Sequence, residues 1–147
     1  MRKAILVAIL FGLPALVVAG ARADETAHRL AVHVDQNDRA VMTLALNNAQ
    51  NVKQHYDAKG EKVLIEIVAY GPGLEMLVAA KSPVRDRIAA MSLESPEITF
   101  AACGNTHDKM VEKAGKDVPL VSEATVVPSG VVRLMELQAD GYAYIRP

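Results

Sequence analysis

The sequence has a single cysteine, no tryptophan and few aromatic residues, and neither sign of charge is in strong excess. One cysteine cannot form a disulfide within the chain, so packing has to stabilise the fold. A single cysteine also excludes a CxxC redox motif and a CxxCH haem site. The formal net charge of −1 offers no excess of positive charge with which to bind nucleic acid or anionic lipid.

Residues 1–23 have the pattern of a signal peptide. Arg2 and Lys3 precede an apolar run at 4–19, and small residues at 21–23 form an A-x-A cleavage site. The run is shorter than the roughly 20 residues of a spanning helix, so we expect cleavage before Asp24 and export to the periplasm, with no membrane anchor afterwards. The remaining chain has 13 of the 16 basic and all 17 acidic side chains, a net charge of −4, and suits one domain.

Short aliphatic runs alternate with segments of helical periodicity along 24–147. The pattern predicts strands and helices in turn, with Asp38 as the N-cap of the first helix. The expected strands are 28–34, 62–69, 97–102, 120–127 and 142–145, and the expected helices are 38–59, 74–80, 82–92, 106–114 and 131–139.

This alternation is typical of an α/β fold with a mainly parallel sheet and right-handed crossovers. Five strands in this length predict a flavodoxin-like three-layer sandwich with strand order 2-1-3-4-5. That order would place Glu66 on an edge strand, where its charge can reach water.

The loops that follow the strands should all emerge at one edge of such a sheet, where ligands bind in open α/β folds. Cys103 would lie there, next to a switch point between the first and third strands. The residues that we expect to shape a substrate pocket around it are Asn37, Tyr70, Gly71, Gly73, Gly104, Asn105, Thr106, Ser129 and Gly130.

Cys103 lies between a predicted strand and a predicted helix capped by Asn105. Free N–H groups at a helix N-terminus stabilise a thiolate and lower its pKa. Asp108 and the apolar neighbours of the sulfur would act in the opposite direction. These residues therefore leave two alternatives open, a reactive thiol or an inert buried one.

Other kinds of site find little support in the sequence. Cys103 and His107 could give two ligands to copper or zinc, but no second clustered pair completes a metal site. The 70–73 loop is not a phosphate-binding motif, and a flavin is disfavoured, so no cofactor is expected. The other histidines, His28, His33 and His55, are expected at strand or helix surfaces.

Several stretches taken together are typical of one family. They are HVDQND at 33–38, NNA at 47–49, YGPG at 70–73, ACGNT at 102–106 and the ending from 127 to 147. On these stretches the chain resembles the DsrE/DsrF-like family of small sulfur-relay proteins, in its exported branch. The resemblance covers essentially all of 24–147.

This resemblance implies a flavodoxin-like domain that assembles into homotrimers or hexamers. It also implies that Cys103 carries sulfane sulfur as a persulfide, exchanged with a donor and an acceptor. Such a protein would be a carrier or sulfurtransferase-like at most. The alternatives are an oligomeric ligand-binding or scaffold module with a structural Cys103, and metal or redox sensing through Cys103, His107 and Met110.

Overall fold

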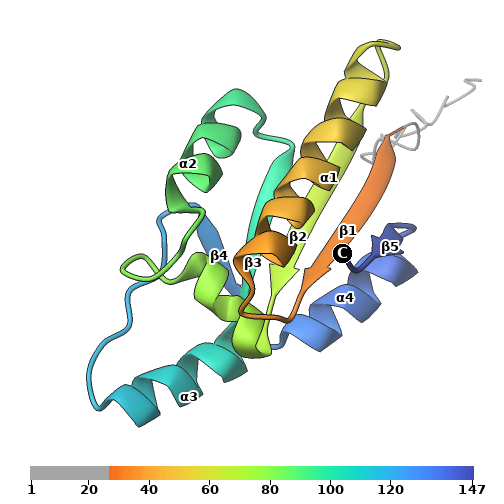
Figure 1. Cartoon of the computed structure of the whole chain (residues 1–147). Coiled ribbons are helices and arrows are strands. Elements are labelled where there is room, and N and C mark those ends of the chain that lie inside the picture. Colours follow the sequence, from red (N-terminus) through yellow and green to blue (C-terminus); the bar gives the residue numbers. More distant parts are fainter. Residues whose placement is uncertain (1–26) are drawn as a thin grey trace, which may run out of the picture.

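The computed structural model describes residues 27–147, so the expected signal peptide lies outside the described residues. The chain alternates between strands and helices along its length (Figure 1). The strands are β1 His28–Val34, β2 Val63–Ala69, β3 Ile98–Cys103, β4 Ala124–Val127 and β5 Ala143–Ile145. The helices are α1 Arg39–Asp57, α2 Arg85–Glu94, α3 Gly104–Ala114 and α4 Gly130–Ala139, with a 3₁₀ helix, η1, at Gly71–Leu77.

The five strands form one sheet in which every pair is parallel, which confirms the predicted α/β fold and its flavodoxin-like layout. The strand order is β4-β3-β2-β1-β5, however, and not the predicted 2-1-3-4-5. The first three crossovers all step in one direction from β1, and the last one returns to the opposite side of β1. Strands β1 and β3 are therefore not neighbours, and the expected switch point between them does not exist.

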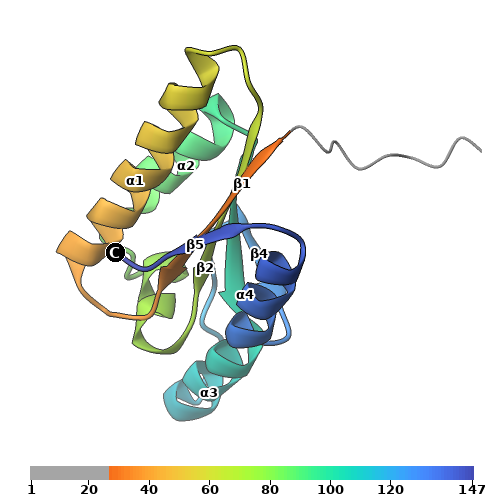
Figure 2. The same ribbon diagram turned by 90° about the vertical axis from the view of Figure 1, so that its right-hand side faces the viewer.

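The handedness of the crossovers explains the layers. Right-handed connections that step in one direction put their helices on one face, and a connection that returns puts its helix on the other. Figure 2 shows this arrangement, with α1 and α2 on one side of the sheet and α4 on the other. The two faces have separate apolar cores. The larger lies under α1, η1 and α2, and a smaller cluster lies under α4.

The position of Glu66 differs from the sequence-based expectation. Strand β2 lies between β1 and β3, so Glu66 is in the middle of an interior strand. Its carboxylate oxygens accept two hydrogen bonds of 2.7 Å from the guanidinium of Arg133 in α4. A charge on an interior strand is tolerated here because a buried carboxylate can be paired and hydrogen-bonded.

Several element boundaries also differ from the prediction. Residues 74–80 were expected as a helix, but the structure has the 3₁₀ helix η1 at Gly71–Leu77, which ends before residue 78. Helix α2 begins at Arg85, after the expected Ser82–Pro83 start. Strand β4 is confined to Ala124–Val127, and Leu120 forms an isolated antiparallel bridge with Val78.

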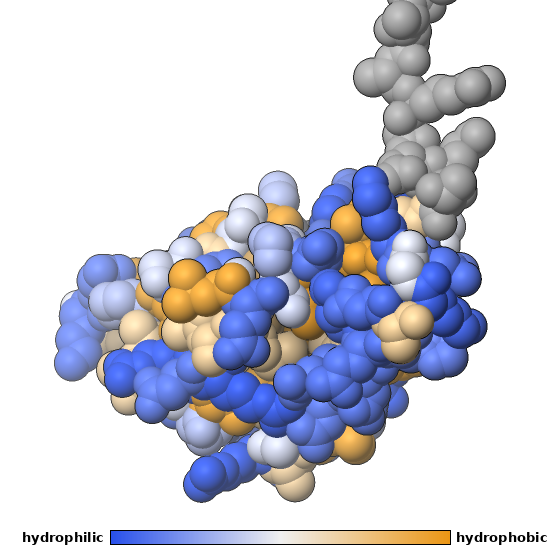
Figure 3. Space-filling model, turned by 90° about the horizontal axis from the view of Figure 1, so that it is seen from above, coloured by the Kyte–Doolittle hydropathy of each residue, from blue (hydrophilic) through white to orange (hydrophobic). Residues whose placement is uncertain are grey.

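Figure 3 views the amino edge of the sheet, where hydrophilic side chains cover most of the surface and apolar ones form separate patches. Among residues 27–147, no helix is both long and apolar enough to cross a membrane.

Candidate functional site

Cys103 is the last residue of β3 and the N-cap residue of α3. The helix begins directly at Gly104, so Asn105 lies inside it and is not its cap, contrary to the prediction. A Cβ atom at Gly104 would lie 3.1 Å from the Val127 carbonyl oxygen, so glycine fits this tight position without any adjustment of its neighbour. Cys103 is a free cysteine and only 5% exposed.

Two helix N-termini meet at the Cys103 sulfur. Burial raises the pKa of the thiol, but hydrogen bonding from the Thr106 hydroxyl and from the backbone N–H groups of Gly130, Thr106 and Asn105 lowers it. The combined donors outweigh burial, so the pKa of Cys103 lies below its ordinary value. Asn105 and Thr106 belong to α3, whereas Gly130 is the first residue of α4. The thiolate is therefore stabilised from both helices.

Thr106 connects the cysteine to the glycine-rich segment after β2. Its Oγ1 accepts a 3.0 Å hydrogen bond from the backbone N–H of Gly71. Because a hydroxyl oxygen can accept one bond while its hydrogen donates another, Thr106 can hold Gly71 and still donate to the Cys103 sulfur. Gly71 has a φ of +54°, a conformation that favours glycine.

Gly130 lies under the ring of Tyr70. A Cβ atom at Gly130 would come within 2.8 Å of Tyr70 Cβ and 3.2 Å of Cys103 Cβ. A Cβ atom at Gly73 would likewise collide with the Val34 carbonyl oxygen. The glycines of the two loops therefore permit close backbone approach at the carboxyl edge of the sheet.

His33 is buried beside this site, which corrects its predicted surface position. It is only 5% exposed, and its ring stacks on Tyr70 with ring centroids 4.6 Å apart. His33 Nδ1 and the Tyr144 hydroxyl share a 2.7 Å hydrogen bond. His33 Nε2 is buried without a hydrogen-bond partner, and the nearest charge is the Asp35 carboxylate at 3.8 Å.

The surroundings keep both rings of the stack uncharged at neutral pH. Burial lowers the pKa of His33 below its ordinary value, with Asp35 opposing the shift and Arg146 adding to it. Burial raises the pKa of Tyr70, and the negative charge of Asp35 raises it further. The imidazole of His33 and the phenol of Tyr70 are therefore both uncharged at neutral pH.

The structure brings together most of the expected pocket residues. Tyr70, Gly71, Thr106 and Gly130 surround Cys103, and Gly104 and Asn105 form the first turn of α3. Ser129 occupies the N-cap position of α4 without a capping side-chain bond, and Gly73 lies in η1. Asn37 is exposed in the loop after β1.

His33, Tyr144 and the Glu66–Arg133 pair are parts of the site and its surroundings that the sequence pattern does not reveal. The alternation of β1 could have placed His33 on the same face as Ala31, because side chains two residues apart share a face of a strand. Tyr144 gives no such signal, because its contact with His33 depends on pairing between the first and last strands.

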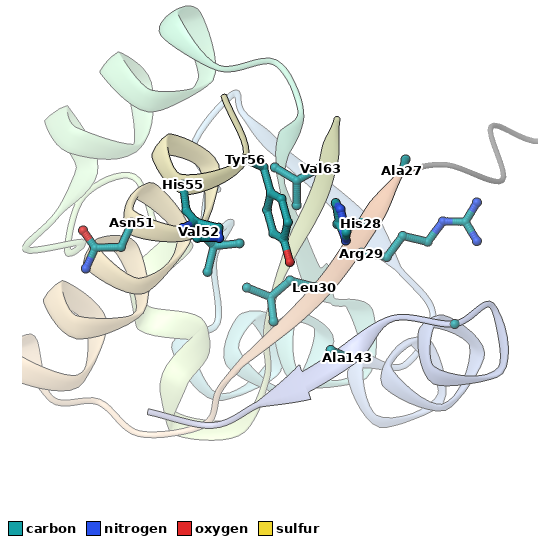
Figure 4. A pocket seen from close by; sticks show the side chains of 11 residues that line it. Ala27, His28, Arg29, Leu30, Asn51, Val52, His55, Tyr56, Val63 and Ala143 are labelled. Atoms are coloured by element: carbon teal, nitrogen blue, oxygen red, sulfur yellow. The ribbon is translucent and has the colours of Figure 1, made fainter. Parts of the chain in front are cut away.

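Among the described residues, pockets also lie away from Cys103. A cavity of about 610 Å³ opens between the amino end of β1, the C-terminal part of α1 and the start of β5 (Figure 4). His28 and Tyr56 stack there with ring centroids 3.8 Å apart, and His28 Nε2 is 2.7 Å from Glu61 Oε2. This cavity is at the edge of the sheet opposite to the cysteine.

The part of the chain that the structure describes contains no cluster of ligands for the metal site considered from the sequence. No group of three His, Cys, Asp or Glu side chains is placed to hold an ion there. His107 is half-buried, and its Nε2 lies 2.7 Å from the Val118 carbonyl oxygen. His107 therefore tethers the loop after α3.

No family model and no curated protein matches the sequence. A solved structure does match, that of a protein of unknown function, MTH1491, from Methanobacterium thermoautotrophicum. The two chains are 31% identical, the match covers 82% of this chain and 99% of that chain, and the TM-score is 0.67. The similarity extends over nearly all of the described residues and includes the fold, but it carries no activity with it.

Proposed function

We propose that this chain, which belongs to the same family as the archaeal protein MTH1491, handles sulfur through Cys103. Cys103 would accept, hold and pass on a sulfane sulfur as a persulfide. The observation that supports this proposal is the convergence of two helix N-termini and one hydroxyl on the sulfur of the only cysteine. The resemblance to the DsrE/DsrF-like family points to the same residue.

The transfer step is redox-neutral. The Cys103 thiolate attacks the outer sulfur of a donor persulfide, R–S–SH. A new S–S bond forms on Cys103, the old S–S bond breaks, and R–S⁻ leaves with the electron pair. The N–H groups that favour the thiolate also favour the terminal anion of the bound persulfide, since both place negative charge at the same helix ends. The protein then acts as a carrier, and turnover requires an acceptor.

Mass spectrometry of the intact protein after treatment with polysulfide tests the proposal. We expect a gain of the mass of one sulfur atom that maps to Cys103 and is reversed by a reducing thiol. The Cys103→Ser variant is the matched control and should gain nothing. A wild-type protein that takes up no sulfur at Cys103 would exclude the carrier function.

A scaffold role is the second candidate, because Cys103 is 5% exposed. In that case the thiol would react with alkylating reagents only after unfolding, and Cys103→Ser would leave function intact. In the carrier, by contrast, the folded protein should be alkylated with a midpoint below about pH 8.5, the ordinary value for a cysteine. The sensing hypothesis has less support, since His107 is engaged by the Val118 carbonyl.

We place the protein in the periplasm, on the strength of the signal-like pattern at 1–23. Export predicts that the protein isolated from the periplasmic fraction begins at Asp24. An N-terminus at Met1 on protein from the cytoplasmic fraction would contradict export.

We also propose that the protein is a homo-oligomer, a trimer or hexamer. Helix α4 leaves three large apolar side chains exposed, Val131, Val132 and Met135, and surfaces of this kind are often covered by a partner. Analytical ultracentrifugation should find a mass above that of the monomer. Met135→Lys should lower that mass, whereas Leu93→Lys on α2, an even more exposed apolar position, should not. A monomeric wild type would refute this part of the proposal.

A further inference from the structure

The ion pair between Glu66 and Arg133 is built more tightly than a surface salt bridge. Arg133 Nε and a terminal guanidinium nitrogen each lie 2.7 Å from a different carboxylate oxygen of Glu66. The side chain of Glu66 is only 12% exposed, and that of Arg133 is 31% exposed. A bidentate pair of this kind fixes orientation as well as distance, because both planar groups must align.

Arg133 is in the first turn of α4. Its backbone N–H donates a 2.9 Å hydrogen bond to the Ser129 carbonyl, and Ser129 is the N-cap residue of the helix. Gly130 lies in the same turn, so close to Cys103 that a Cβ atom on it would be 3.2 Å from Cys103 Cβ, and its N–H group is among the donors that lower the pKa of the thiol. A shift of Arg133 relative to the sheet therefore moves Gly130 with it.

The apolar contact between α4 and the sheet is small. The buried cluster beneath it consists of three small or β-branched strand residues, Ala31, Val68 and Ala101, and two leucines of the helix. The opposite core contains more than four times as many buried residues. A small apolar contact permits sliding more readily than a large interdigitated one, so a directional polar contact has more influence on where α4 sits.

We propose that the Glu66–Arg133 ion pair is a positioning device that holds the first turn of α4 so that the Gly130 N–H group points at the Cys103 sulfur. Glu66 and Arg133 are thus positioning residues for the thiolate and for the persulfide that replaces it. The role for the persulfide rests on the proposed function. The effect of the ion pair on the thiol does not depend on whether the protein carries sulfur.

Other charged groups near the two ends of this connection are few. Around the pair, Glu136 lies 3.6 Å from Arg133 Nη1, and Tyr142 is close enough to Glu66 for its pKa to be raised by the carboxylate, after the larger effect of burial. Near the thiol, the titratable neighbours are Tyr70, whose pKa is raised mainly by burial, and His33, which stacks on Tyr70 and has the Asp35 carboxylate 3.8 Å away. None of these groups bridges Glu66 and Cys103, and the ion pair connects Glu66 to the thiol through α4.

The test is the pH profile of Cys103 alkylation by iodoacetamide in the folded full-length protein. Removing the Glu66 charge in Glu66→Gln should raise the thiol pKa and lower the rate at neutral pH by about three- to tenfold, because the Gly130 hydrogen bond to a charged sulfur weakens. Arg133→Lys keeps the charge but loses the bidentate geometry, and it should shift the profile in the same direction by less.

The matched control is Asp57→Asn, which removes an ion pair with Lys53 on the surface of α1. This variant should leave the profile unchanged. Circular dichroism confirms that each variant is folded, and if Glu66→Gln does not fold, Arg133→Lys decides. A folded variant whose profile matches the wild type would overturn the inference. The proposed function fails separately, if the wild type takes up no sulfur while its profile still responds to Glu66→Gln.

Discussion

Gly130 is the residue whose replacement should disturb the site most directly without removing any functional group. Gly130→Ala places a methyl group 2.8 Å from Tyr70 Cβ and 3.2 Å from Cys103 Cβ, so the first turn of α4 must move away. Overpacking of this kind costs about 1–3 kcal/mol of unfolding free energy. We also expect a higher thiol pKa, because the Gly130 N–H group moves with the backbone.

Urea unfolding followed by circular dichroism, together with the alkylation profile, measures both effects of Gly130→Ala. Gly60→Ala is a suitable control, because Gly60 has a φ of +69° and no atom close to an added Cβ. This control should lose some stability through backbone strain but keep the wild-type alkylation profile. If Gly130→Ala keeps the wild-type profile too, Gly130 does not support the thiolate.

His33 should make stability depend on pH. Its pKa in the folded protein lies below the ordinary 6.5, mainly because it is buried, so the unfolded chain binds the proton more readily. The stability that His33 contributes is complete above about pH 6.5 and is lost as the pH falls through the folded-state pKa. The wild type should therefore lose more unfolding free energy between about pH 7.5 and pH 5 than His33→Gln does.

The same pH series on His55→Gln provides the comparison for His33. His55 is exposed on α1, so its removal should leave the acid-induced loss of stability as in the wild type. An identical loss of unfolding free energy in wild type and His33→Gln would mean that the buried imidazole does not cause the loss of stability in this pH range.

At the residue scale, the sequence was sufficient to place Cys103 and its glycine loops at one edge of the sheet. That inference needs only the alternation of strands and helices, which is local. His33 could not be placed in the same way, because a histidine in a strand can equally well be exposed at the surface or buried against an aromatic ring. Its burial depends on Tyr70, which directly follows β2, and on Tyr144 in β5.

At the scale of elements, α1 is the helix whose start the sequence predicts best. Asp38 Oδ1 accepts hydrogen bonds from the backbone N–H groups of Ala40 at 2.6 Å and Val41 at 3.3 Å. Asp38→Ala leaves both donors without this partner and should lower the unfolding free energy by about 1 kcal/mol. Asp38→Ser, which retains a capping oxygen, should recover most of the loss in urea unfolding. No difference between the two variants would argue against a capping role.

The start of helix α3 is an element boundary that the sequence pattern does not predict correctly. Asn105 is a good N-cap residue, and the pattern therefore predicted a start at Thr106. In the structure the start moves back to Gly104, and the Asn105 N–H group also donates to the Pro128 carbonyl at 3.2 Å. That contact comes from the loop before α4, so tertiary structure determines the boundary.

At the scale of the whole molecule, strand order was the part that sequence could not determine. Both 2-1-3-4-5 and the observed 4-3-2-1-5 have five parallel strands joined by right-handed crossovers, and local patterns are the same in both. Glu66 was expected on an edge strand because the predicted order puts its strand at an edge, where its charge could reach water. The partner, Arg133, is 67 residues away.

The pairing of β5 with β1 joins distant parts of the chain, and Tyr144 tests its contribution. Tyr144→Phe removes the hydroxyl that bonds His33 Nδ1 and should lower the unfolding free energy by about 1 kcal/mol. Tyr56→Phe is the control, because the stacking of Tyr56 on His28 needs only the ring. Equal stability losses in the two variants, measured by urea unfolding, would contradict a specific role for the Tyr144–His33 bond.

The position of β5 also has a consequence for the order in which the fold can be completed. Strand β1 obtains its second neighbour only from residues 143–145. Until β5 pairs with it, one edge of β1 is open and His33 lacks Tyr144, even if β2, β3 and β4 are already in place. A partly folded chain is therefore exposed to wrong strand pairing at this edge of β1, and only the docking of β5 removes that exposure.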